Sequence, residues 1–158
     1  MDAETKRTVL RMFTYGLYAL TIADGDKGHG ATVNWVSQVS FDPALLAVSV
    51  EKNSRSIELL RQEKAFAINV YRADQRDLAG QLGRRFANRP DKFQGVRCNT
   101  GVTGAPLLAD SLAYVECRVV READAGDSVL ILADIVEVGV SGEGKPLTME
   151  AAGFRHAG

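Results

Sequence analysis

Cysteine and histidine are scarce in this sequence, and their scarcity excludes several kinds of catalytic and metal site. The 158 residues include two cysteines and two histidines. Cys98 and Cys117 form no C-x-x-C pair, and neither has the clustered partners that zinc requires, so no metal site is expected. Two isolated thiols, with a charged N-terminus that lacks the apolar core of a signal peptide, predict a cytoplasmic protein.

The few histidines and cysteines also lie where a catalytic base or nucleophile is not expected. His29 lies in a glycine turn and His156 lies close to the last residue, so we expect both to be exposed surface groups. Cys117 lies in an apolar strand pattern and is expected in the core. The motifs of zinc proteases, phosphate-loop proteins, serine hydrolases and dinucleotide-binding folds are absent. The sequence therefore identifies no catalytic residue.

Blocks of basic residues and long apolar runs are missing as well. The formal net charge is -1, from 19 basic and 20 acidic residues without a basic cluster, so neither nucleic acid nor an anionic membrane is an expected partner. No apolar run approaches the roughly 20 residues of a membrane span. A hydrophobic content of 46% and a charged content of 25% are ordinary for a globular protein, and the length predicts one domain, residues 1–158.

What the sequence does contain is a series of β-branched and aromatic runs, which predicts a mainly β fold. Strands are expected at residues 13–22, 31–40, 45–51, 65–71, 112–122 and 128–140, and short helices at residues 2–11, at 54–62 and after Asp74. Because no strand–helix–strand unit repeats, we expect an antiparallel β-barrel with short flanking helices. The basic connection at residues 83–93, with three arginines and a lysine, is a candidate phosphate-binding loop, although a solvated loop more often has this composition.

Residues 28–56 combine a strand with a candidate seat for phosphate. Asn53, Ser54, Arg55 and Ser56 stand at the entrance of a predicted helix. Small polar residues there leave backbone N–H groups free at the positive end of the helix dipole, and arginine adds a forked donor that matches phosphate. This pattern favours a mononucleotide such as a flavin, although an ordinary strand pair followed by a capped helix has the same pattern. Trp35 is either a partner for the flat ring or an ordinary core or interface aromatic.

The order of these motifs resembles the flavin reductase-like family of FMN-binding split-barrel proteins. The first motifs of the resemblance are F-T-Y-G-L-Y at 13–18, G-A-T-V-N at 30–34, S-Q-V-S-F-D-P at 37–43 and S-R-S at 54–56. It continues through F-A-I-N-V at 66–70, D-K-F at 91–93, G-A-P-L at 104–107 and P-L at 146–147. The resemblance therefore covers the chain from about Phe13 to Phe154.

The resemblance implies a barrel that dimerises and holds FMN, or FAD, near the subunit interface. The residues that it places at the isoalloxazine and ribityl groups are Thr32, Val33, Asn34, Trp35, Val36, Ser37, Gln38 and Ser40. Those that it places at the phosphate are Asn53, Ser54, Arg55 and Ser56, with Lys92 and Phe93 as further contacts. The implied reaction is hydride transfer from NADH or NADPH to flavin N5, with the reduced flavin passed to a monooxygenase or another acceptor.

Two positions depart from the family pattern. Many of the reductases carry histidine after Gly-Asp in the final hairpin, where this chain has Ser128, and Gln38 replaces a common serine. Relatives with the Tyr-Gly-Leu-Tyr opening resemble flavin modules of electron-transfer proteins. An FMN-containing electron carrier that serves a protein partner is therefore the alternative function. A barrel that has lost its cofactor and acts as an interaction domain is the third.

Overall fold

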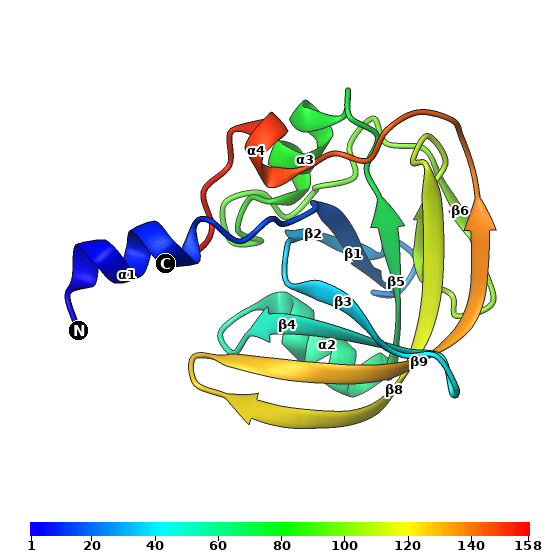
Figure 1. Ribbon diagram of the computed structural model, residues 1–158. Helices are drawn as coiled ribbons and strands as arrows, with labels where there is room; N and C mark the ends of the chain where they lie inside the picture. The colour runs from blue at the N-terminus through cyan, green and yellow to red at the C-terminus, as the bar shows by residue number, and fades with distance from the viewer.

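The structure, a computed structural model that describes residues 1–158, is built on one curled antiparallel sheet (Figure 1). Its seven strands lie in the order β2-β1-β5-β8-β9-β4-β3. Their bounds are β1 Tyr18–Ile22, β2 His29–Val33, β3 Val36–Ser40, β4 Leu45–Glu51, β5 Ala65–Val70, β8 Ala113–Ala125 and β9 Ser128–Val140. The two outermost strands, β2 and β3, follow each other in the chain, so the curled sheet is a barrel that is split between them. The predicted antiparallel split barrel is confirmed.

The single strand predicted at residues 31–40 is wrong, because the chain changes partners in its middle. β2 pairs with β1, whereas β3 pairs with β4 at the other end of the sheet. Between them, the buried side-chain amide of Asn34 donates to the His156 carbonyl at 2.9 Å and lies 3.1 Å from Met149 Sδ. The Trp35 carbonyl accepts the Ser49 N–H at 3.0 Å. These distant partners stabilise a break that the local sequence does not signal.

The first predicted strand is also shorter than expected. β1 begins at Tyr18 rather than at residue 13, and the preceding segment makes a single bridge between Gly16 and Thr148. Helix α1 spans Ala3–Leu10 with Asp2 as its N-cap, close to the prediction. It has no buried residue and extends away from the barrel beside the C-terminus (Figure 1). The side chain of Arg11 contacts that terminus by donating from Nε to the Ala157 carbonyl at 3.2 Å.

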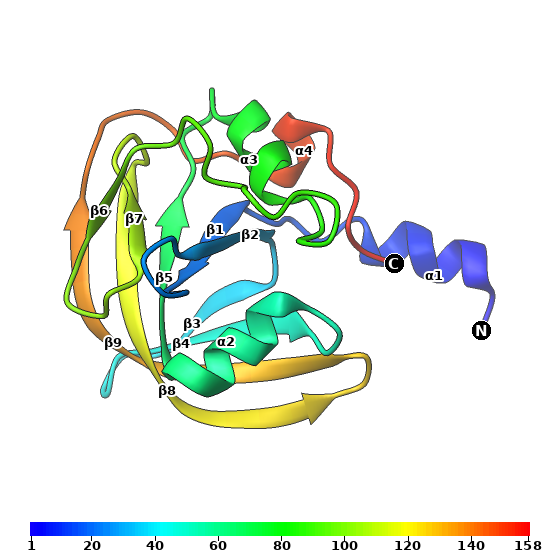
Figure 2. The ribbon, with the colours of Figure 1, turned by 180° about the vertical axis from the view of Figure 1, so that it is seen from behind.

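Helix α2 closes one opening of the barrel. It spans Arg55–Glu63 and packs against β1, β2, β4 and β5 (Figure 2). Its buried residues Ile57, Leu59 and Leu60 join the main core cluster inside the barrel. Burial of such side chains contributes roughly 1.5–3 kcal/mol each, so the core and this helix stabilise each other. The core prediction for Cys117 is confirmed, because its side chain is fully buried in the same cluster.

A second core cluster lies outside the barrel, where two short helices pack on β1. Helix α3 spans Arg76–Leu82 and helix α4 spans Met149–Ala152. Leu82 and Leu147 are fully buried there. The helix expected after Asp74 is confirmed, but Asp74 does not cap it: Gln75 takes the N-cap position, and Asp74 accepts a 2.6 Å bond from Arg72 Nε. None of the four helices combines the length and apolar composition needed to cross a membrane.

A small two-stranded sheet, β6 Cys98–Thr100 and β7 Pro106–Leu108, covers another side of the barrel. The turn between these strands is held by Glu116 of β8, whose side chain is 1% exposed. Its carboxylate accepts the backbone N–H groups of Val102 and Thr103 at 3.1 and 2.9 Å, and the Thr103 hydroxyl at 2.6 Å. Glu116 is therefore a buried acid whose role is to satisfy the backbone of one turn.

Candidate functional site

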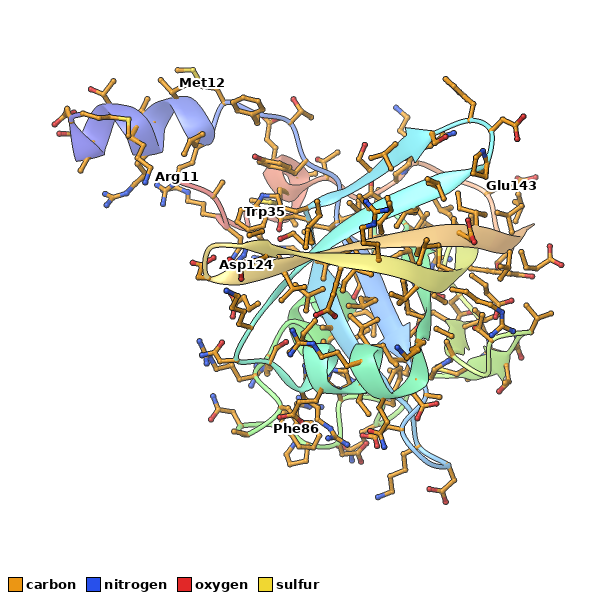
Figure 3. All side chains as sticks on the ribbon, turned by 90° about the horizontal axis from the view of Figure 1, so that it is seen from below. Arg11, Met12, Trp35, Phe86, Asp124 and Glu143 are labelled. Atoms are coloured by element: carbon orange, nitrogen blue, oxygen red, sulfur yellow. The ribbon has the colours of Figure 1, made fainter.

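A cavity of about 1000 Å³ lies between β2, the start of α2, the loop after α3 and the C-terminal segment. Small-molecule sites typically have volumes of roughly 300–1,000 Å³, so this one has room for a mononucleotide. Figure 3 shows Phe86 and Trp35, which both line the cavity, at well separated positions. We call the part lined by Asn53–Ser56, Arg84, Arg85 and Phe86 the polar end. The part lined by Trp35, Met149, Phe154 and His156 is the aromatic end.

Ser54 organises the start of α2 at the polar end. Its Oγ accepts the Ile57 N–H at 3.2 Å and donates to the Glu51 carbonyl at 2.8 Å, so its hydroxyl is fully used as an N-cap. The N–H groups of Arg55 and Ser56, in the first helical turn, have no intrahelical acceptor. Together with the positive end of the helix dipole, they favour an anion at this position.

The guanidinium of Arg55 is fixed beside these N–H groups by two acids. Its Nη2 lies 3.0 and 3.1 Å from the two carboxylate oxygens of Asp24, and Nη1 lies 3.1 Å from Glu58 Oε2. The bonds to Glu58 and Asp24 raise the arginine pKa, so the group stays charged. Its Nε is the one fully buried side-chain nitrogen or oxygen without a hydrogen-bond partner. A buried donor left unpaired costs about 1–3 kcal/mol, so the fixed position of this guanidinium is held at a cost in stability.

His29 is buried beside this turn, which contradicts the expectation of an exposed residue. Its side chain is 4% exposed, and its Nε2 lies 2.9 Å from Ser56 Oγ. Burial is the main cause that lowers its pKa to about 4, and the positive charge of Lys92 lowers it further. The imidazole is therefore neutral at pH 7. The sequence prediction failed because residues 83–93 fold over the glycine turn, with the Phe86 ring 5.9 Å from that of His29.

Lys92 fastens this loop rather than presenting a free charge. Its side chain is 5% exposed, and Nζ donates to the carbonyls of Gly30 at 2.9 Å and Leu82 at 3.1 Å. Burial lowers its pKa. The neighbouring Phe93 ring packs against Gly30, where a Cβ would lie 2.9 Å from it, so any larger residue at this position would displace the ring. Lys92 thus lines the cavity with two of its three donors already bonded to protein.

At the aromatic end, the C-terminal segment meets the break between β2 and β3. The rings of Trp35 and His156 lie 5.4 Å apart at 48°, and Trp35 is 38% exposed. His156 is also exposed, as the sequence predicted. The His156 carbonyl accepts the Asn34 amide, as described above, and Phe154 packs against Arg76 at 5.6 Å. Three separate contacts therefore hold residues 154–157 at this end of the cavity.

Comparison with known proteins identifies the family to which this architecture belongs. The family model described as the flavin reductase like domain matches residues 10–158. The chain belongs to the flavin reductase-like family. It is 34% identical over 141 residues to the high molecular weight rubredoxin of Moorella thermoacetica, covering 88% of this chain and 62% of that protein.

Two solved structures of flavin reductase-type proteins have the same fold. BorF, the flavin reductase component of a bacterial two-component tryptophan halogenase, is 29% identical with a TM-score of 0.83, covering 96% of this chain and 95% of BorF. The NADH:FAD oxidoreductase SgcE6 of Streptomyces globisporus is 26% identical with a TM-score of 0.79, covering 89% and 86%. Recognition of the flavin reductase-like family from sequence motifs is confirmed.

The cavity includes only part of the set that the family pattern predicts for flavin. The predicted residues that line it are Thr32, Val33, Asn34, Trp35, Asn53, Ser54, Arg55, Ser56 and Lys92. Those that do not line it are Val36, Ser37, Gln38, Ser40 and Phe93. Phe93 packs against Gly30. The other four residues lie on β3, which comes after the break at Trp35 and forms the opposite edge of the sheet from β2. Gln38 Nε2 donates within β3, to the Ser40 carbonyl at 3.2 Å.

Several lining residues were not among the predicted flavin contacts. They include His29, Arg84, Arg85, Phe86, Ser128, Met149, Phe154 and His156. The basic composition of residues 83–93 was the one sequence signal that Arg84 and Arg85 could belong to the site. The C-terminal residues carried none, because only tertiary packing brings them to β2.

Proposed function

We propose that the cavity binds a phosphorylated flavin, FMN with FAD as the alternative, with its phosphate at the polar end. The observation that carries this assignment is the charged guanidinium of Arg55, fixed by Asp24 and Glu58 beside the first-turn N–H groups of α2 in the cavity wall. A phosphate oxygen is the acceptor that such a donor set matches. The isoalloxazine would then extend toward Trp35, and the cavity volume accommodates both parts. The residues present therefore fit a flavin.

In this proposal the free edge of β2 holds the ring. β2 pairs only with β1, and although the Gly30 carbonyl accepts Lys92 Nζ, the backbone beyond it on β2 has no second strand and can bind a polar ring edge. The Thr32 hydroxyl is not free, because it bonds to the Ala79 carbonyl at 2.6 Å and to the Tyr71 hydroxyl at 2.9 Å. The backbone of residues 31–33, more than its side chains, is expected to orient the isoalloxazine. Residues 1–158 would act as one FMN-binding domain in the cytoplasm.

The proposed activity is reduction of flavin by NADH or NADPH. A bound flavin accepts hydride and passes electrons on, here to a monooxygenase or an electron-transfer protein, so the chain need only bind, orient and exclude water. An anaerobic titration of the purified, flavin-loaded protein with NADH and then NADPH, followed by flavin absorbance, tests this. Rapid bleaching supports the reductase. A protein that binds no flavin would contradict the proposal.

A second function, an FMN-containing electron carrier, is favoured by two observations. One of the relatives is a rubredoxin, of which this chain spans 62% of the length. Ser128 also stands in the cavity wall, 3% exposed, with its Oγ donating to Asp127 Oδ1 at 3.0 Å. A carrier would take electrons from dithionite while NADH and NADPH leave the flavin oxidised.

Ser128→His tests whether this position limits the reaction with nicotinamide. Serine is too short to cover a nicotinamide ring and cannot become cationic. Since Ser128 borders the open cavity, the larger ring has space to enter it, and we expect kcat/KM for NADH to rise about tenfold, roughly 1.4 kcal/mol, with FMN affinity unchanged. Steady-state kinetics check this, with Ser128→Asn as a matched neutral variant. Slower reduction in Ser128→His would mean that the native serine already suits the hydride donor.

We also propose that the protein is a homodimer with the flavin near the interface. β3 is an exposed edge strand; Val39 on this strand is 52% exposed, and Phe41 directly after it is 91% exposed. On β9, Val138 is 58% exposed. Apolar surface of this kind is typical of an interface. In a dimer, the predicted flavin residues of β3 that miss the cavity of their own chain would lie near the partner.

Phe41→Asp should therefore yield monomers with reduced flavin content, because a charge in an apolar contact is costly. Sedimentation velocity at micromolar concentration, read at the flavin and protein wavelengths, measures both effects. Val102→Asp, at a position 61% exposed on the β6–β7 turn, is the matched control and should remain dimeric. A wild-type monomer that retains flavin would contradict the dimer.

A further inference from the structure

The imidazole of His29 lies directly behind a hydroxyl of the polar end. Its Nε2 is 2.9 Å from Ser56 Oγ, and both side chains are buried. Ser56 is the second residue of α2, so its hydroxyl lies beside N–H groups that have no intrahelical acceptor. Ser54, the other serine of this turn, already uses its hydroxyl as the N-cap. Ser56 is therefore the serine of the turn whose hydrogen can still be given to a ligand.

We propose that His29 positions the Ser56 hydroxyl for the flavin phosphate, by carrying its own hydrogen on Nε2 and donating it to Ser56 Oγ. A neutral imidazole has one N–H and one acceptor nitrogen. With the hydrogen on Nδ1, Nε2 would accept the Ser56 hydrogen, and the phosphate would lose that donor. With the hydrogen on Nε2, the Ser56 hydrogen stays free for the anion. The inference rests on the proposed function, because it needs a phosphate at this end.

The environment of His29 keeps its imidazole neutral, whichever ring nitrogen carries the hydrogen. Asp24 faces it from the turn after β1, Arg55 from α2 and Lys92 from the loop after α3. Burial and the two cations lower the histidine pKa, while Asp24 raises it, with the outcome at about 4. The other charged residues that line the same cavity are Glu51, Glu58, Arg84 and Arg85. At pH 7, His29 is therefore uncharged, and its proposed effect on Ser56 depends on which ring nitrogen carries the hydrogen.

Two substitutions separate this role from simple packing. His29→Leu fills space without a donor, whereas His29→Gln keeps a side-chain N–H. We expect FMN to bind about tenfold more weakly to His29→Leu and nearly normally to His29→Gln, measured by titration calorimetry. Riboflavin, which lacks the phosphate, should bind wild type and both variants equally. In a Ser56→Ala background, His29→Leu should cost no further affinity, because the two residues act as one unit.

Nitrogen-15 NMR of the side chains reads the tautomer itself. The chain has only two histidines, so comparison with His29→Gln assigns the ring signals. In the FMN-bound protein at pH 7, we expect Nε2 protonated and Nδ1 unprotonated. An unprotonated Nε2, or an equal loss of riboflavin and FMN in His29→Leu, would overturn the inference. Wild-type protein that binds neither flavin would overturn the proposed function and this inference with it.

Discussion

Replacing Ser54 and Ser56 together by alanine should weaken FMN binding by about 1.5–3 kcal/mol, roughly ten- to a hundred-and-fiftyfold in Kd, because one hydrogen bond to a charged phosphate, that of Ser56, is lost. The two single variants should differ. Ser56→Ala removes a hydroxyl that faces the proposed phosphate, so most of the lost affinity belongs to it. Ser54→Ala removes an N-cap, and should lower the free energy of unfolding by about 1 kcal/mol.

Calorimetric titration with FMN, alongside thermal melts, separates the two effects. Riboflavin serves as the control ligand, since without a phosphate it should bind the double variant as well as the wild type. The fold should persist, because both hydroxyls lie at the start of α2 while its packing depends on Ile57, Leu59 and Leu60. An unchanged Kd for FMN in the double variant would place the phosphate elsewhere in the cavity.

Glu116→Ala should lower the free energy of unfolding by about 3–5 kcal/mol. The substitution removes the buried carboxylate that accepts the N–H groups of Val102 and Thr103, each of these bonds to a charged group being worth about 1.5–3 kcal/mol, and it leaves a cavity. For a chain of this size the melting temperature should fall by about 6–20 °C. Glu116→Gln, which keeps one acceptor oxygen, should lose less. A melt of the flavin-free proteins measures this without any contribution from ligand binding.

Glu122→Ala is the matched control on the same strand. Glu122 pairs with Arg61 at 3.0 Å, but their side chains are 43% and 53% exposed. An exposed ion pair contributes about 0–1 kcal/mol, so this variant should melt close to the wild type. Equal losses at Glu116 and Glu122 would show that burial of the carboxylate is not what matters.

Local sequence was sufficient where an element is determined by its own residues. β4 was predicted with the bounds that the structure shows, because its apolar run is bracketed by polar residues on both sides. α2 begins after Ser54, as its capping pattern indicated. The resemblance to the family motifs further predicted that the antiparallel barrel is a split barrel. Each of these signals lies within a few residues of the element that it describes.

The misplaced features depend on partners distant in the chain. The break at Asn34 and Trp35 is stabilised by Met149, His156 and Ser49, and nothing near residue 34 signals it. His29 was predicted exposed because its glycine neighbours suggest a turn, whereas the loop after α3 buries it. Three of the seven residues of the polar end, Arg84, Arg85 and Phe86, come from such tertiary contacts, as does all of the aromatic end except Trp35. Local composition can indicate residues suited to phosphate, but it does not predict which distant segments pack around them to form the site.

Helix α2 couples flavin binding to the thermodynamic stability of the barrel. The same nine residues close the core through Leu59 and Leu60 and offer the proposed phosphate contacts at their first turn, with no intervening element. A ligand present at a hundred times its Kd adds about 2.7 kcal/mol to the stability of the state that binds it. The flavin concentration would therefore determine how large a loss of stability from core substitutions the protein tolerates. Mildly destabilised variants should fold in flavin-rich cells and be lost in flavin-starved ones.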